Sequence, residues 1–157
     1  MGKTGYFTHP DCRKHEMGAG HPECPERLDA IEDRLLITGV GDALERREAT
    51  PAAMGELLLA HGRRHVAALR GLSDILAEEI AAGGPDHYSL DTDTSMNRFT
   101  YRAALLSAGA AIDAVDAVMT GELENAFCST RPPGHHAGPD FMGGYCFLNN
   151  AAVAAQG

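Results

Sequence analysis

The sequence predicts an α/β fold, and two features near its C-terminus carry that prediction. Residues 125–130 (NAFCST) predict a short buried strand, and residues 147–156 (FLNNAAVAAQ) predict the opening of a helix. The segment that joins them lies within residues 131–150 (RPPGHHAGPDFMGGYCFLNN), whose prolines and glycines neither a helix nor a regular strand would tolerate. This order of elements places a loop at the carboxyl end of a strand, where open α/β sheets bind their ligands.

The N-terminal part of the chain predicts a first strand and a first helix. Residues 5–9 (GYFTH) predict the strand, and a loop rich in glycine and histidine follows over residues 10–25. A helix is predicted from about Pro25, because four apolar residues recur there at helical spacing, namely Leu28, Ile31, Leu35 and Leu36.

The middle of the chain predicts two helical segments before residue 86. Thr50 followed by Pro51 is typical of a helix N-terminus with threonine as the N-cap, and the first segment contains Met54, Leu57 and Leu58. Gly62 interrupts it, and Gly83-Gly84-Pro85 ends the second segment. The apolar stripe of that second segment consists of Val66, Leu69, Leu72, Ile75, Leu76 and Ile80.

Residues 97–120 predict a long alanine-rich helix. Its predicted apolar face consists of Leu105, Ala108, Ile112, Val115 and Met119. The alanines and Gly109 suit close packing against a sheet, so we expect this helix to belong to the scaffold.

The composition predicts one domain without a membrane span. The 157 residues suit a single domain, and the 44% of apolar residues can fill one core. A formal net charge of −9 argues against direct binding of nucleic acid and favours cationic substrates. No apolar run approaches the roughly 18 residues of a membrane helix, and the N-terminus lacks a signal-peptide core. The four cysteines form no CxxC pair, which predicts reduced thiols and a cytoplasmic protein.

The adjacent histidines His135 and His136 are the candidate catalytic residues of the glycine- and proline-rich loop. A bare histidine pair is more often part of a polar surface loop or a satisfied pair in the core. Here the pair lies among four glycines and three prolines, and glycine is entropically costly to order. Two neighbouring imidazoles can supply a general base and a cationic partner near pH 7. These residues favour a catalytic loop, expected to be buried at the sheet edge, without naming a reaction.

Three segments, in the same order along the chain, resemble the histone deacetylase superfamily. Residues 131–150 resemble its active-site loop, and residues 20–31 (GHPECPERLDAI) resemble its first active-site loop and helix. Residues 91–97 (DTDTSMN) resemble the rim segment of the class II deacetylases. Residues 143–156 (GGYCFLNNAAVAAQ) are most similar to the polyamine-type members, the acetylpolyamine amidohydrolases.

The resemblance implies an arginase/deacetylase-like three-layer fold with a mostly parallel sheet, here incomplete. Residues 1–157 would be the N-terminal portion of a single deacetylase-like domain. The family holds its Zn²⁺ cofactor with two aspartates and a histidine, and none of these has a counterpart in this sequence. We therefore expect the zinc ligands downstream of Gly157, together with the aspartates that orient the histidine pair and the tyrosine that stabilises the oxyanion. The 157-residue chain alone is expected to bind no catalytic zinc and to be inactive.

The resemblance also implies roles for five residues around the histidine pair. Arg27 matches an arginine of the internal channel that attracts the released acetate. Asp93 matches the rim aspartate that accepts N–H groups of the substrate, and Asp91 is a second rim candidate; helix N-capping is the alternative for both. Gly144 is expected to offer a backbone carbonyl to the substrate amide. Tyr145, where the family usually has phenylalanine, would form a flat wall along the methylene stem.

The implied reaction is zinc-dependent amide hydrolysis that removes acetyl groups from acetyl-lysine or acetylated polyamines. His135 and His136 would transfer its protons, with His136 the expected general base. The hydroxyl of Tyr145 favours a small cationic substrate, and a homo-oligomer is left open. A catalytically inactive binding or regulatory module of the same fold is the alternative function.

A separate alternative concerns the first loop. Cys12, His15, His21 and Cys24 are spaced C-x2-H-x5-H-x2-C, and four such ligands can hold a structural zinc ion. The short central gap makes tetrahedral closure awkward, so a loop that frames a pocket is favoured over a zinc site.

Overall fold

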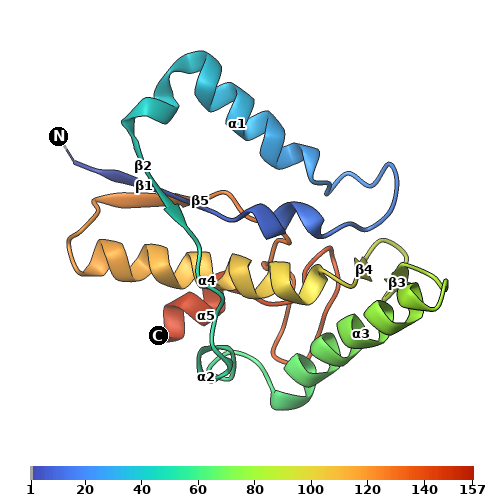
Figure 1. Ribbon diagram of the computed structural model, residues 1–157. Helices are drawn as coiled ribbons and strands as arrows, with labels where there is room; N and C mark the ends of the chain where they lie inside the picture. The colour runs from blue at the N-terminus through green and yellow to red at the C-terminus, as the bar shows by residue number, and fades with distance from the viewer. Residues whose placement is uncertain (1) are drawn as a thin grey trace.

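The computed structural model describes residues 2–157 and confirms the predicted α/β class (Figure 1). Strands β1 (Thr4–Thr8), β2 (Leu44–Glu48) and β5 (Asn125–Cys128) form a parallel sheet in the order β2-β1-β5. Helix α1 (Glu26–Thr38) lies on one side of this sheet and α4 (Thr100–Met119) on the other, so the elements form three layers (Figure 1). Because the strands are parallel, their carboxyl ends meet at one edge of the sheet.

The other elements lie mainly around α4. Helix α3 (Arg63–Ala81) packs near the antiparallel hairpin of β3 (His87–Ser89) and β4 (Ser95–Asn97), and α5 (Asn150–Gln156) packs against α4. Three short helices complete the fold, namely η1 (Pro10–Lys14), η2 (Val40–Ala43) and α2 (Met54–Leu57). The hairpin and η1 are new relative to the sequence prediction, which has only loop in both places.

The main hydrophobic core lies between α2, α3, α4 and α5. Its fully buried side chains include Leu57, Leu69, Met96, Phe147 and Val153. Phe147 and Leu148 belong to the loop after β5, so the segment that carries the histidine pair is anchored in this core at its C-terminal end. The described part of the chain contains no helix that is both long and apolar enough to cross a membrane.

Strand β2 escapes the sequence prediction because its residues, LERRE, show no apolar alternation. It pairs with β1 through backbone hydrogen bonds, while its arginines cover aromatic rings of the central strand. The guanidinium carbon of Arg46 lies 4.8 Å from the centre of the Tyr6 ring, and that of Arg47 lies 5.9 Å from the Phe7 ring. A charged strand of this kind is typical of a sheet edge.

Strand β5 forms where it is predicted, but it is not buried. Phe127 is 52% exposed, and its ring stacks on that of Tyr6 with 6.0 Å between the ring centres. Within residues 2–157, β5 pairs with β1 alone, so its other edge carries no strand in this part of the chain.

Three predicted helix features are wrong in detail. Thr50 does not cap a helix: its backbone N–H and its hydroxyl both donate to the Asp113 carboxylate, each at 2.9 Å, and α2 begins at Met54. The predicted apolar face of α4 is also shifted, because Met119 is 80% exposed. Small residues are buried instead, and three of them, Ala110, Ala114 and Ala117, pack against Phe7 of the sheet. In α1 only Leu28 of the predicted stripe is buried.

Gly109 shows how close this packing is, and it gives a stability prediction. A Cβ atom at Gly109 would lie 1.7 Å from the backbone carbonyl oxygen of Thr50. We expect Gly109→Ala to destabilise the protein by about 1–3 kcal/mol or more, because backbone cannot move aside as a side chain can. Urea unfolding would measure this change.

Gly71→Ala is the matched control for this substitution. Gly71 also lies within a long helix, α3, but a Cβ atom there would meet nothing within 4 Å. This variant should gain roughly 0.5–1 kcal/mol from helix propensity. Equal stabilities of the two variants would contradict the packing argument.

Candidate active site

A cavity of about 460 Å³ brings together three segments that are distant in the sequence. They are the first loop, the turn between β3 and β4, and the loop after β5. The cavity is lined by six of the seven residues predicted for the site, namely Arg27, Asp93, His135, His136, Gly144 and Tyr145. Asp91 is not among the lining residues, whereas Pro22, Glu23 and Pro133 are.

The histidine pair lies on the cavity wall with both rings exposed, which corrects the expectation that the pair is buried. The ring centres of His135 and His136 are 4.3 Å apart, and the ring planes are inclined by 50°. His136 rests on the backbone of Gly144: a Cβ atom there would lie 2.8 Å from Cδ2 of His136, and φ of Gly144 is +56°. Glycine at this position therefore serves both the turn and the placement of the ring.

The backbone beneath the histidine pair is fixed by Cys146. The backbone N–H of His136 donates to Sγ of Cys146 at 3.4 Å, and that thiol lies 3.3 Å from the carbonyl oxygen of Gly144, to which it donates. Burial raises the pKa of the Cys146 thiol, which keeps it protonated as a donor. All four cysteines lie within the described residues, and none of them is paired with another.

The end of the loop after β5 is held by Asn149 and a buried histidine. Asn149 caps α5 by accepting the N–H of Ala152 at 3.0 Å, and its Nδ2 donates to the carbonyl of Ala137 at 3.0 Å. Its own backbone N–H donates to Nε2 of His61 at 2.9 Å. Burial lowers the pKa of His61, which favours the neutral ring that this bond requires. The helix opening predicted from the sequence is confirmed, and it positions the loop.

Tyr145 has an unusual backbone conformation for a residue other than glycine, with φ of +70°. Its backbone N–H donates to Oγ1 of Thr94 at 2.9 Å, which links the loop after β5 to the β3–β4 turn. Its ring meets that of His21 edge to face, with 4.7 Å between the ring centres. These contacts hold the Tyr145 ring on the cavity wall.

The two candidate rim aspartates have different places in the β3–β4 turn. Oδ1 of Asp91 accepts the N–H groups of Asp93 at 3.0 Å and of Thr94 at 2.7 Å, and these bonds, the first above all, lower the pKa of Asp91. Asp91 thus shapes the turn, while Asp93 is the one that lines the cavity. Neither caps α4, because that helix begins at Thr100 and its first turn bonds to the side chain of Asn97.

Arg27 is the exposed member of a three-residue charged group. Its side chain is 55% exposed, and Nη1 donates to Oε1 of Glu23 at 3.1 Å. Glu23 is only 4% exposed, and Arg131 beside it is fully buried. Arg131 donates from Nε and Nη2 to the two oxygens of the Glu23 carboxylate, at 2.9 and 2.8 Å.

Sequence reasoning missed Glu23 and Arg131. Arg131 also donates to the carbonyls of Cys12 and His15, so it joins the first loop to the start of the loop after β5. One signal could have indicated them. Arg131 directly follows a predicted buried strand and precedes two prolines, and a buried charge is costly unless it has a partner, so a buried acidic partner could have been expected.

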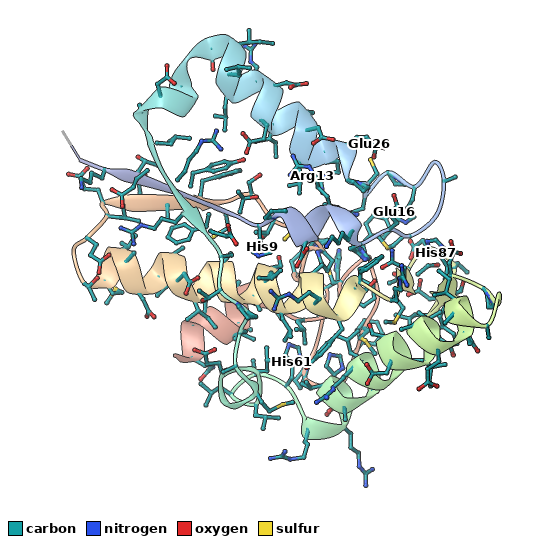
Figure 2. All side chains as sticks on the ribbon, viewed as in Figure 1. His9, Arg13, Glu16, Glu26, His61 and His87 are labelled. Carbon is teal, nitrogen blue, oxygen red and sulfur yellow. The ribbon has the colours of Figure 1, made fainter. Side chains whose placement is uncertain are left out.

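The alternative zinc site in the first loop does not form. Nδ1 of His15 is 2.8 Å from the hydroxyl of Thr100, which engages that ring nitrogen. Both ring nitrogens of His21 are in contact with backbone groups of Glu23 and Asp93. Residues 2–157 contain no group of three or more His, Cys, Asp or Glu side chains placed to hold a metal ion. Figure 2 shows three other histidines, His9, His61 and His87, at separate places on the fold.

Comparison with known proteins decides the family. Residues 21–157 match the model of the histone deacetylase domain. This chain belongs to the histone deacetylase family. The crystal structure of the HDA15 HD domain superposes with a TM-score of 0.86 at 34% identity, over 99% of this chain and 43% of that one. The similarity therefore includes the fold as well as the motifs.

Relatives of this deacetylase-family chain carry names of related activities. A histone deacetylase-like amidohydrolase of Pseudomonas aeruginosa is 41% identical over 88% of this chain and 34% of its own length. A probable deacetylase of Archaeoglobus fulgidus is 37% identical over 98% of this chain and 40% of its own. The human polyamine deacetylase HDAC10 is 35% identical over 97% of this chain and 23% of its own. The chain thus spans less than half the length of these relatives.

Proposed function

We propose that the protein is a zinc-dependent hydrolase that removes acetyl groups from acetyl-lysine or from acetylated polyamines. The observation that carries the proposal is the cavity in which two adjacent histidines, an aromatic wall, a rim carboxylate and an arginine face one space. The names of the relatives support both the amide-hydrolysing chemistry and the polyamine option.

Each lining residue has a role in this proposal that follows from its chemistry. His136 takes a proton on a ring nitrogen as the general base, and His135 beside it returns a proton to the departing amine. The aromatic face of Tyr145 packs along the methylene stem of the substrate. The carbonyl of Gly144 and the carboxylate of Asp93 accept N–H groups of the substrate, and Arg27 attracts the acetate product.

Zinc binding does not follow from residues 2–157, because this part of the chain lacks three ligands placed around one point. We propose that the ligands come from a part of the protein outside these 157 residues, and that the 157-residue chain by itself has no hydrolase activity. The zinc would supply a polarised carbonyl and an acidified water when bound.

The substrate is proposed to be cationic. The net charge of −9 attracts amines over long range, and Asp93 presents a carboxylate at the cavity. Tyr145 in place of the phenylalanine usual in the family adds a hydroxyl at the cavity, which favours a small polar amine over a protein side chain.

Hydrolysis assays on two substrates test the proposal. The protein with its complete chain should release acetate from a fluorogenic acetyl-lysine peptide or from N-acetylputrescine, and metal analysis should find one zinc ion per chain. The 157-residue chain should release none and carry no zinc. A complete protein that binds these amines without hydrolysing them would instead be the inactive binding module.

A further inference from the structure

We infer that His21 is a positioning residue that holds the Tyr145 wall and the Asp93 rim together across the mouth of the cavity. The inference concerns the site of the proposed function and rests on that function only for its kinetic test. His21 does not itself line the cavity, so its effect on a substrate would pass through residues that do.

Both ring nitrogens of His21 are engaged by the backbone, which fixes the orientation of the ring. Nε2 lies 2.8 Å from the carbonyl oxygen of Asp93, and Nδ1 lies 3.0 Å from the backbone nitrogen and 3.3 Å from the carbonyl oxygen of Glu23. The ring of His21 therefore links the first loop to the β3–β4 turn.

The ring of His21 also supports Tyr145, and the contacts close into a cycle. The two rings meet edge to face at 4.7 Å, while the N–H of Tyr145 donates to the buried Thr94, the neighbour of Asp93. Contacts therefore run from His21 to Asp93, along the chain to Thr94, across to Tyr145 and back to His21. Three segments of the chain are joined in this way by side chains outside the hydrophobic core.

The backbone of Tyr145 gives a reason why such support matters. A residue other than glycine with positive φ persists only where its surroundings fix it. Thr94 fixes the backbone of Tyr145, and His21 fixes the direction of its ring. Without His21, the ring can leave the cavity wall although the backbone stays in place.

Fluorine NMR of protein labelled with 3-fluorotyrosine tests this inference without any need for activity. Tyr145→Phe assigns the signal of Tyr145 among the four tyrosines of residues 1–157, and Tyr6 and Tyr101, which do not line the cavity, report on the fold. His21→Ala should shift or broaden the Tyr145 signal and leave the signals of Tyr6 and Tyr101 in place. His21→Phe, which keeps an aromatic edge against Tyr145, should restore much of the signal. An unchanged Tyr145 signal in His21→Ala overturns the inference.

Kinetics of the active protein supply the second test. His21→Ala should raise KM about three- to tenfold, the range expected for losing one aromatic contact and one hydrogen bond, with kcat within about twofold. His21→Phe should recover part of the KM change. His87→Ala, at a histidine paired with Asp86 outside the cavity, is the control and should leave KM unchanged. If the wild-type protein had no hydrolase activity, the proposed function would be wrong. If the wild-type protein were active and His21→Ala left KM unchanged, this inference would be wrong instead.

Discussion

Replacing His136 with alanine is expected to lower kcat of the active protein by about 10²–10⁴-fold, the range that general acid–base catalysis contributes. The ring is exposed and rests on Gly144, so its removal should leave the fold intact. KM should change little, because the loss concerns proton transfer in the transition state more than substrate binding. Steady-state kinetics of His136→Ala, together with its thermal melting curve, would measure both effects.

His135→Ala and His87→Ala complete this experiment. His135 lies on the same cavity wall, so its replacement should also reduce kcat, whereas His87 lies outside the cavity and its replacement should not. If His136→Ala and His87→Ala had the same kcat, His136 would have no part in catalysis.

Separating the buried ion pair of Glu23 and Arg131 is expected to have the largest effect on stability. Arg131→Met would leave the Glu23 carboxylate 4% exposed with Arg27 as its remaining arginine partner, and it would free the carbonyls that Arg131 binds. Removing one partner of a buried pair typically costs about 3–5 kcal/mol. Urea unfolding of the wild type and the variant would show this loss.

Two further variants separate burial from charge in this group. Glu23→Leu combined with Arg131→Met removes both charges, so the double variant should be more stable than Arg131→Met alone. Arg27→Met removes the exposed guanidinium from the same carboxylate and should cost at most about 1 kcal/mol. If Arg27→Met lowered the free energy of unfolding as much as Arg131→Met does, burial would not determine how much each ion pair contributes to stability.

Much of the site could be predicted from the sequence, because its motifs contain residues with restricted or unusually free backbone conformations. The run of prolines and glycines around His135 and His136 indicates a loop, and the structure places that loop between β5 and α5. The resemblance of the segments holding Arg27, Asp93 and Tyr145 to one family places them in a common pocket, and the structure brings them together.

The features that the sequence did not reveal depend on contacts between distant residues. Strand β2 has the composition of an exposed loop, and only its pairing with β1 makes it a strand. Asp91 and Asp93 are typical N-cap residues by type, yet the nearest helix begins several residues later and they shape a hairpin turn instead. Glu23, Arg131 and His21 act through partners up to 119 residues away, which no local pattern encodes.

The unpaired edge of β5 has a practical consequence for work with the 157-residue polypeptide. Along this edge the backbone N–H and C=O groups of β5 pair with no strand of residues 2–157, and the ring of Phe127 faces solvent beside them. An edge of this kind can pair with a strand of another molecule. The short sequence NAFC carries no lysine or arginine to oppose such addition. When this polypeptide is concentrated, light scattering should therefore rise at a lower protein concentration than it does for Phe127→Lys. In that variant the lysine at the same edge would oppose strand addition.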